Sequence, residues 1–270
     1  MSEDKAGQRY WDELWANTPP PKAVHLRLHG WRNHVYRRFH ALFRAAFADL
    51  NPHGRKLLEV GCARSAWLPY FAVEFGFDVY GLDYSEIGCR QAMWVLAKHG
   101  VRGRVVCADL FHPPAAMFGV FDVVFSMGVV EHFVHTSTCL AALARFLKTD
   151  GLMITIIPNM TGLTGLLLRC LNRPLFEKHT VLDAAALRQA HEQAGLDVLS
   201  CDYFMFTNFG VVRNLSGIAP GSGEYVVKNA AMILLHALSA AVWLIEESIG
   251  PLPAHSFTSP FIYCLARVRG

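Results

Sequence analysis

The feature that most constrains the fold is an apolar run that ends in a turn of small residues and is followed by a second run that ends in an acid. The first run, 57–60, breaks at Gly61 and is typical of a buried parallel strand that enters a tight turn before a helix. The second run, 79–82, ends at Asp83, about twenty residues after the glycine. In a doubly wound α/β sheet this pairing places a nucleoside at the strand ends, with the carboxylate on the ribose hydroxyls. The sequence therefore predicts a nucleoside-binding site.

The details of the turn decide which nucleoside is expected. The turn lacks the GxGxxG spacing that lets a dinucleotide pyrophosphate approach bare backbone. Instead Glu-Val-Gly-Cys-Ala-Arg-Ser at 59–65 resembles the first motif of class I S-adenosylmethionine-dependent methyltransferases, and Gly-Leu-Asp-Tyr-Ser at 81–85 resembles their second. The similarity continues at 107–110 and 121–132, so four motifs stand in the order and spacing of the family. The resemblance implies a small-molecule methyltransferase with S-adenosylmethionine as cofactor and S-adenosylhomocysteine as product.

The first motif departs from the family at two positions. Ala63 and Ser65 stand where the family has its second and third glycines. They keep the side chains small but make left-handed backbone less favourable. We interpret them as a tolerated variant. The alternative is a protein that keeps the fold but has lost the cofactor, and it would leave Asp83 and Asp109 at strand ends without a role.

The resemblance also implies a role for each motif residue. Glu59 shapes the first loop, Asp83 takes the ribose, and Asp109 with the Leu110 amide takes the adenine. The backbone at 126–127 takes the methionine amino group. Two N-terminal aromatic residues would fold over the methionine part of the cofactor, although anchoring of the N-terminal segment explains them equally well. The cofactor-binding residues so implied are Tyr10, Trp11, Glu59, Gly61, Cys62, Ala63, Asp83, Tyr84, Asp109, Leu110, Ser126 and Met127.

His132 is the candidate catalytic residue, because it follows the fourth expected strand and its ordinary pKa near 6.5 suits removal of a proton at neutral pH. A histidine that only supports the loop by hydrogen bonds is the alternative. The pair Glu131 and His132 resembles the Glu-His of quinone-type O-methyltransferases, where nearby acids can hold a divalent ion. Gly128 stands in the place of an upstream acid, and a hard cation needs several oxygen ligands, so we expect no metal.

The pattern from 57 to 158 alternates strand and helix, which predicts an α/β fold with a doubly wound, mostly parallel seven-stranded sheet and an antiparallel late strand. The expected strands are 57–62, 78–83, 104–109, 121–127, 151–157, 196–204 and 261–268. The expected helices are 66–75, 86–99 and 136–147, with a turn at 148–151 before the fifth strand.

Residues 1–50 are expected to form an N-terminal helical cap, and 51–270 the methyltransferase domain with lid insertions at about 159–180 and 210–257. In the cap, apolar residues recur at helical spacing from Val24 to Leu42, after prolines that end any earlier helix. The arginines among them indicate either a solvated helix face or a surface for an acidic substrate or membrane.

The lid insertions are expected to hold the acceptor. The proposed acceptor-binding residues are Phe176, His179, Phe204 and Phe206. The most apolar run of the chain, 230–245, falls short of the roughly twenty residues that span a bilayer. We favour a buried helix there that roofs the pocket or packs a dimer. A contact with a membrane surface or a true span stays open.

Composition limits the partners. A net charge of +3 on 270 residues is too small to indicate nucleic acid, and the fourth motif lacks the Asp/Asn-Pro-Pro-Tyr/Phe of enzymes that methylate nucleobase amines. Seven cysteines without metal-ligand spacing, and an N-terminus unlike a signal peptide, indicate reduced thiols and a cytoplasmic protein. We expect a monomer or homodimer that methylates a small, partly apolar molecule, most plausibly at oxygen. A lipid or quinone methyltransferase on a membrane, and a non-catalytic cofactor-binding scaffold, are the alternatives.

Overall fold

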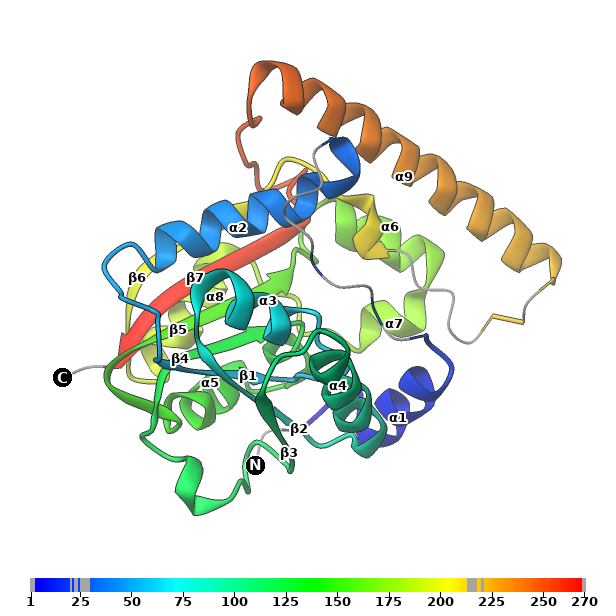
Figure 1. Cartoon of the computed structure of the whole chain (residues 1–270). Helices are drawn as coiled ribbons and strands as arrows, with labels where there is room; N and C mark the ends of the chain where they lie inside the picture. The colour runs from blue at the N-terminus through cyan, green and yellow to red at the C-terminus, as the bar shows by residue number, and fades with distance from the viewer. Residues whose placement is uncertain are drawn as a thin grey trace.

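The computed structural model describes residues 3–19, 21, 24, 30–212, 218–219 and 221–268. Seven strands form one sheet in the order β3-β2-β1-β4-β5-β7-β6, with β7 antiparallel to both of its neighbours (Figure 1). The strands are β1 Lys56–Val60, β2 Asp78–Asp83, β3 Gly103–Cys107, β4 Phe121–Met127, β5 Leu147–Pro158, β6 Leu196–Phe204 and β7 Phe261–Val268. The predicted α/β class, with a mostly parallel seven-stranded sheet and one antiparallel late strand, is confirmed.

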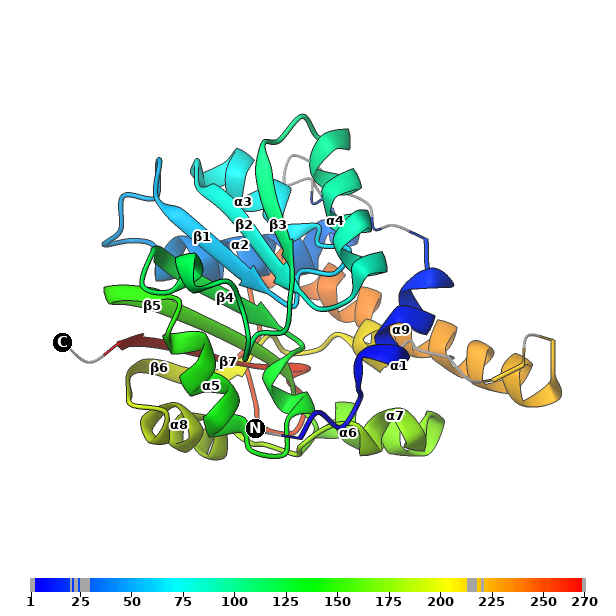
Figure 2. The same ribbon diagram turned by 90° about the horizontal axis from the view of Figure 1, so that it is seen from below.

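Helices cover both faces of this sheet. They are α1 Gln8–Ala16, α2 His34–Ala46, α3 Trp67–Phe75, α4 Glu86–Lys98, α5 Thr136–Ala144, α6 Leu163–Leu171, α7 Arg173–Glu177, α8 Ala184–Gln193 and α9 Gly223–Ile249, with 3₁₀ turns η1 Trp31–Asn33, η2 Ala115–Met117, η3 Val130–His132 and η4 Phe209–Val212. One core lies under α2, α3 and α4, and the other lies under α5 and α8. Figures 1 and 2 show these two layers on opposite sides of the sheet.

The central strands are apolar throughout because each supplies both cores. Successive side chains of a strand point to opposite faces. Leu57 is buried in the core under α2 and α3, and the next residue, Leu58, is buried in the core under α5. A continuous apolar run therefore identifies a strand covered on both sides.

Some element boundaries differ from the prediction. β1 ends at Val60 and β3 at Cys107, so Cys62 and Asp109 lie in the loops that follow. The turn predicted at 148–151 is wrong, because these residues lie inside β5. The strand is irregular there: its pairing with β4 moves from Phe121 opposite Leu147 to Val123 opposite Leu152. Between these two pairs β5 has four residues where β4 has one, so the residues that were expected to turn form a bulge in the strand.

The N-terminal fifty residues have two different structural roles. The helix expected from Val24 to Leu42 begins only at His34, and Leu28 lies outside the described residues. Its aromatic stripe continues as Phe39 and Phe43, both fully buried among the strands, so α2 is a layer of the sheet core. α1 packs beside α4 near the ends of the parallel strands.

The two expected lid insertions form α6, α7, η4 and α9. They share a small apolar cluster centred on Met160, Leu168 and Val212, separate from the two cores of the sheet. The helix expected at 230–245 is present, but the expectation that it is buried over the pocket is wrong, because no residue of α9 lines the cavity. Its packing in a dimer stays a prediction. Along α9 the fully buried side chains are Met232, Ser239, Trp243 and Glu246, which lie along one side of the helix. By length and composition alone α9 could cross a membrane.

Candidate cofactor and active site

A cavity of about 490 Å³ lies over the carboxyl ends of the central strands. β2 contributes Asp83, β4 contributes Met127 and β5 contributes Pro158, while Gly61 follows β1. Open α/β sheets bind ligands at this edge, outside the carboxyl ends of parallel strands. The volume is in the range of cofactor and small-molecule sites.

The turn after β1 depends on one glycine. Gly61 has φ 77°, and a Cβ at this position would lie 2.3 Å from Cγ2 of Val129. Both the backbone conformation and the contact exclude a larger residue. The next left-handed residue is Arg64, with φ 57°, and neither Ala63 nor Ser65 has a positive φ. The loss of the family's second and third glycines therefore does not strain the backbone at those two positions.

Glu59 stabilises the turn after β1 through hydrogen bonds. Its carboxyl accepts a hydrogen bond from Oγ of Ser65 at 2.5 Å. That oxygen accepts in turn from the backbone N–H groups of Trp67 and Leu68, both at 3.0 Å, where α3 begins. Burial raises the pKa of Glu59 to about 8, so the carboxyl is protonated at neutral pH. Glu59 thus connects the strand to the helix start beside the cavity, as a shaping residue would.

Asp83 faces the same cavity with its carboxylate fixed by backbone. The Ala63 N–H donates to Oδ2 at 3.0 Å, and the Ser85 N–H donates to Oδ1 at 2.8 Å. Burial raises the pKa of Asp83 to about 6, and repulsion by Asp12 adds to this effect, while the backbone hydrogen bonds oppose it. The group is mainly ionised at neutral pH. It can still accept hydrogen bonds from two adjacent hydroxyls, which suits a ribose.

The N-terminal segment covers part of the cavity. Its backbone pairs with the loop after η3, because the Lys5 N–H donates to the His132 carbonyl at 2.8 Å. The Tyr84 hydroxyl donates to Asp4 at 2.8 Å. Of the two aromatic residues proposed for the methionine part, Trp11 lines the cavity. The Tyr10 ring packs instead against the Lys178 ammonium, 4.4 Å from the ring centre.

Asp109 lies beside the cavity rather than in its lining. The Ala108 N–H donates to the Asp83 carbonyl at 2.9 Å, which places the loop after β3 next to Asp83. The Asp109 carboxylate accepts from the Phe111 N–H at 3.0 Å and lies 2.9 Å from Nδ1 of His112. It is exposed, and among the described residues it does not line the cavity.

Three other proposed cofactor residues serve the core in this structure. Cys62 is fully buried against Gly81, and Leu110 belongs to the core under α5. Ser126 is buried in β4, opposite Val60 of β1. Within the described ranges none of the three side chains lines the cavity, so only their backbone could meet a cofactor.

The four proposed acceptor residues do not come together. His179 lines the cavity, whereas Phe176 packs in the cluster of α6 and α7. The Phe204 ring lies 4.9 Å from that of Phe39 inside the sheet core. Phe206 is absent from the cavity lining that the described part of the chain provides. The apolar lining comes instead from residues that sequence reasoning missed: Trp67, Val129, Ile156, Val211 and Phe261.

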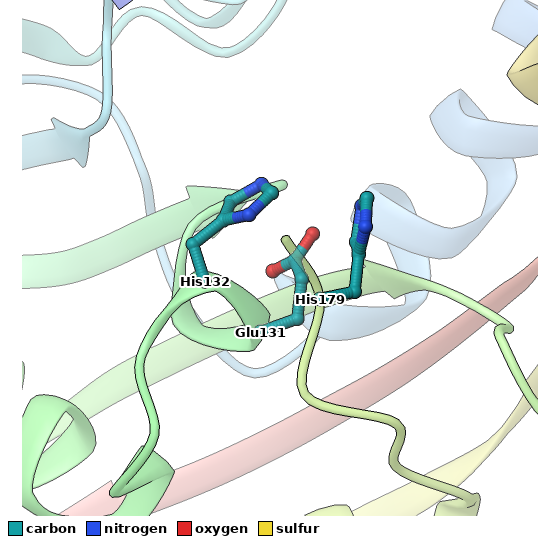
Figure 3. A group of neighbouring side chains, drawn as sticks. All are labelled: Glu131, His132 and His179. Carbon is teal, nitrogen blue, oxygen red and sulfur yellow. The ribbon is translucent and has the colours of Figure 1, made fainter. Parts of the chain in front are cut away.

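Glu131, His132 and His179 meet at the floor of the cavity (Figure 3). Nδ1 of His132 lies 3.0 Å from the Lys178 carbonyl, and Nδ1 of His179 lies 2.8 Å from the Leu175 carbonyl. A carbonyl only accepts, so both Nδ1 atoms carry a proton. Each Nε2 is then left with a lone pair. The two ring centres lie 4.7 Å apart.

The charge state of this group follows from burial. Both carboxyl oxygens of Glu131 are buried with no hydrogen-bond partner in the described part of the chain, and burial raises the pKa of Glu131 to about 8. Burial lowers the pKa of His132 to about 4, and the neighbouring His179 adds to the shift. Burial also lowers the pKa of His179. At neutral pH both imidazoles are therefore mainly uncharged, and Nε2 of His132 is able to accept a proton.

The same three side chains could also hold a metal ion. Each offers one ligand atom, and these atoms lie within 4.8 Å of one another. The sequence analysis singled out Glu131 and His132 but not their meeting with His179, because His179 comes from the segment after α7 and approaches His132 only in the folded chain. Two imidazoles with one carboxylate are a donor set for a transition metal, whereas Mg²⁺ prefers oxygen ligands.

We therefore expect methyl transfer to be independent of Mg²⁺. Initial rates of the purified protein should be equal, within error, before and after treatment with EDTA, and added Mg²⁺ should not raise them. Loss of activity with EDTA and recovery with Mg²⁺ would contradict this expectation. Recovery with Zn²⁺ or Fe²⁺ alone would also contradict it and would assign the three side chains to a transition metal.

The fold and the cavity are those of a class I, Rossmann-like S-adenosylmethionine-dependent methyltransferase. The carboxylate at the end of β2, the glycine turn after β1 and the covering N-terminal segment fit that cofactor. A family model described as a methyltransferase domain matches residues 29–201, more than half of the chain. The chain belongs to this methyltransferase family.

Curated relatives match only part of the chain. A ubiquinone biosynthesis O-methyltransferase of Caulobacter sp. (strain K31) is 33% identical over 108 residues, which are 40% of this chain and 42% of the relative. One of Thiobacillus denitrificans is 30% identical over 154 residues, 53% of this chain and 65% of the relative. The matches thus span less than two thirds of these relatives.

Solved structures share the fold over nearly the whole chain. The [4+2]-cyclase SpnF has a TM-score of 0.63 at 15% identity and covers 98% of this chain and 96% of its own. A geranyl diphosphate C-methyltransferase from Streptomyces coelicolor, solved with Mg²⁺, geranyl diphosphate and S-adenosylhomocysteine, has a TM-score of 0.60 at 14% identity, with coverages of 97% and 98%. At these identities the likeness establishes the fold alone.

Proposed function

We propose that the protein transfers a methyl group from S-adenosylmethionine to an oxygen atom of a small, partly apolar acceptor. The observation that carries this proposal is the neutral His132, which presents the lone pair of Nε2 to the cavity. A hydroxyl acceptor must lose a proton during methyl transfer, and this nitrogen can take it. The names of the partial relatives, which are O-methyltransferases, support the same attacked atom.

The two ends of the cavity differ in chemistry. At the β2 and β1 end, the Asp83 carboxylate and the Gly61 backbone suit the polar nucleoside. At the other end, Ile156, Val211 and Phe261 come from β5, η4 and β7 and form an apolar wall. Pro158 and Phe261 are paired across β5 and β7, so this wall is rigid. We assign the apolar end to the acceptor.

Catalysis then requires that the two reactants are aligned and that the acceptor loses one proton. S-adenosylmethionine supplies an electrophilic methyl group, which an in-line attack transfers without a covalent enzyme intermediate. The chain holds both reactants in one cavity, and Trp11 and the N-terminal segment cover part of it. His132 takes the acceptor proton, and the Lys178 carbonyl keeps its imidazole in the required tautomer.

The proposal is tested with methyl-labelled S-adenosylmethionine and matched acceptors that differ only in the attacked atom. Each set holds an apolar aromatic phenol, thiol and amine. We expect label on the phenol of each set, and much less label with Asp83→Ala, because that variant binds the cofactor weakly. Transfer to the thiol or the amine alone would contradict attack by oxygen. Tight binding of S-adenosylhomocysteine with no transfer to any acceptor would favour the non-catalytic scaffold.

A further inference from the structure

The helix α9 presents a continuous apolar face to solvent. Exposed residues recur every three or four positions along it, and from 226 to 245 all of them are apolar. We call this set the outer face of α9: Val226, Val227, Ala230, Ile233, Leu234, Ala237, Leu238, Ala241, Leu244 and Ile245. Several of its larger side chains are more than half exposed, including Leu234 at 64% and Val227 at 69%. Both ribbon views show α9 extending past the rest of the molecule (Figures 1 and 2).

The opposite face of α9 is fixed to the protein. The Trp243 Nε1–H donates to the Thr207 carbonyl at 3.0 Å, and Oγ of Ser239 accepts from the Phe209 N–H at 2.8 Å. Glu246 is buried and pairs with Arg38 and His34 of the N-terminal region. The helix is therefore anchored along one side, and its orientation leaves the outer face uncovered.

We propose that the outer face of α9 docks on the surface of a lipid bilayer, with the helix axis in the plane of the membrane. A water-exposed apolar face of this length is unfavourable unless a partner covers it. An amphipathic helix lying in the interface has the same division into one apolar side and one polar side. Here the folded protein forms the polar side.

The composition of the outer face favours a lipid surface over a second copy of the chain. From Val226 to Ile245 the face is about 29 Å long, at 1.5 Å per residue, and all of its residues are Val, Ile, Leu or Ala. The cores of protein interfaces are enriched instead in aromatic residues, Met and Arg, and are surrounded by a polar rim. By its length and composition α9 is also apolar enough to enter a membrane.

The anchoring contacts argue against a membrane span. To cross the bilayer, α9 would have to expose buried Glu246 and Ser239 to hydrocarbon and to lose the Trp243 hydrogen bond. Polar groups without partners are costly in that environment. A helix that stays packed on the protein can reach only the interface.

The charges of α9 indicate the kind of lipid surface. Lys228 pairs with Glu224 at 2.7 Å, Glu246 pairs with Arg38 at 3.2 Å, and Glu247 pairs with Arg37. The helix thus offers no basic patch to anionic headgroups. Binding should depend on apolar contact, so neutral vesicles should suffice and salt should have little effect.

The outer face is also connected to the cavity through one short element. η4 packs between α9 and the cavity: Phe209 bonds to Ser239 of α9, and Val211 lines the cavity wall. A membrane-bound α9 would hold the apolar end of the cavity close to the lipid surface. This consequence rests on the proposed function, whereas membrane docking itself does not.

Flotation with vesicles of phosphatidylcholine alone tests the proposal on the full chain. We expect the wild type to float with the vesicles at both 0.1 M and about 0.5 M salt, and alkaline carbonate to release it. The double variant Leu234→Gln, Leu238→Gln should lower the partition coefficient at least tenfold. Glutamine favours helix, and both positions are exposed, so folding should be kept. The matched control is Val73→Gln with Met93→Gln, which removes two exposed apolar side chains from α3 and α4 and should float like the wild type.

Circular dichroism and thermal unfolding establish that each variant is folded, and the pair Leu244→Gln, Ile245→Gln provides a second test at the other end of the face. The proposal is overturned if the wild type does not float, or if the variants float as well as the wild type. Resistance to alkaline carbonate would mean a span instead. A stable dimer that the outer-face variants convert to monomer, without vesicle binding, would assign the face to a second copy.

Discussion

Replacing Asp83 by alanine is expected to weaken the binding of S-adenosylhomocysteine by about a hundredfold or more. The carboxylate would accept two hydrogen bonds from the ribose, each worth about 1.5–3 kcal/mol for a charged acceptor. The same change removes the acceptor of the Ala63 and Ser85 N–H groups, so the turn after β1 also loosens. Calorimetry on the folded variant measures the effect.

A control at the other end of the same strand separates binding from strand stability. Asp78 begins β2 and is exposed, so Asp78→Ala should leave the affinity unchanged. Asp83→Asn keeps one acceptor oxygen and should give an intermediate loss. An affinity within threefold of wild type in folded Asp83→Ala would remove Asp83 from the cofactor site.

The titration of Asp83 adds a pH dependence to this result. Its pKa is raised to about 6 in the folded protein, so the carboxylate becomes protonated as the pH falls from 7 to 5. A protonated carboxyl loses acceptor capacity, and the affinity for S-adenosylhomocysteine should fall over this window. Asp83→Asn has no such group, so its weaker affinity should be constant between pH 7 and pH 5.

The second large effect is expected at His132. His132→Ala should lower turnover by roughly a hundredfold or more, the scale of general base catalysis, and leave the affinity for S-adenosylhomocysteine nearly unchanged. The backbone carbonyl of His132, which holds Lys5, is kept in this variant. Single-turnover methyl transfer gives the rate. His53→Ala, an exposed histidine outside the cavity lining, is the control.

The pH profile distinguishes a base from a supporting residue. Because the pKa of His132 is lowered to about 4, nearly all of the imidazole is in its uncharged base form above pH 5. Protonation of His132 should therefore not lower the wild-type rate between pH 8 and pH 6. Without the imidazole the acceptor must ionise by itself, so the rate of His132→Ala should rise with pH. His132→Asn can keep the hydrogen bond to the Lys178 carbonyl, because its amide nitrogen takes the place of Nδ1. It accepts no proton readily, so it should behave like alanine. A variant profile parallel to that of the wild type would mean that His132 takes no proton.

The sequence determined the sheet and the places of Gly61 and Asp83 at one edge of it. Apolar runs bounded by turns define the parallel strands, because each central strand must fill a core on both faces. Gly61 and Asp83 could be assigned for a related reason. They lie at the ends of adjacent strands, and the parallel register of β1 with β2 brings those ends together whatever the rest of the chain does.

Only the tertiary structure decided which residues surround the proposed acceptor end. His179 reaches His132 because the segment after α7 returns to η3, where the Thr180 N–H donates to the Glu131 carbonyl. Phe204 is as apolar as any acceptor-binding residue, but the register of β6 with β7 turns it into the core beside Phe39. The sequence shows that apolar residues recur with the period of a strand. No local property shows whether one of them will lie in the core or in the wall of the cavity.

The same limit explains α9. Its apolar run correctly indicates a helix, and apolar residues on every side favoured burial. The folded chain offers only a narrow strip around η4, which Ser239 and Trp243 occupy. Leu235 is partly buried in the small apolar cluster, whereas the residues of the outer face stay exposed in the described structure. Whether an apolar helix is buried or exposed depends on how much surface the rest of the fold presents to it, and that is a property of the assembled structure rather than of the segment.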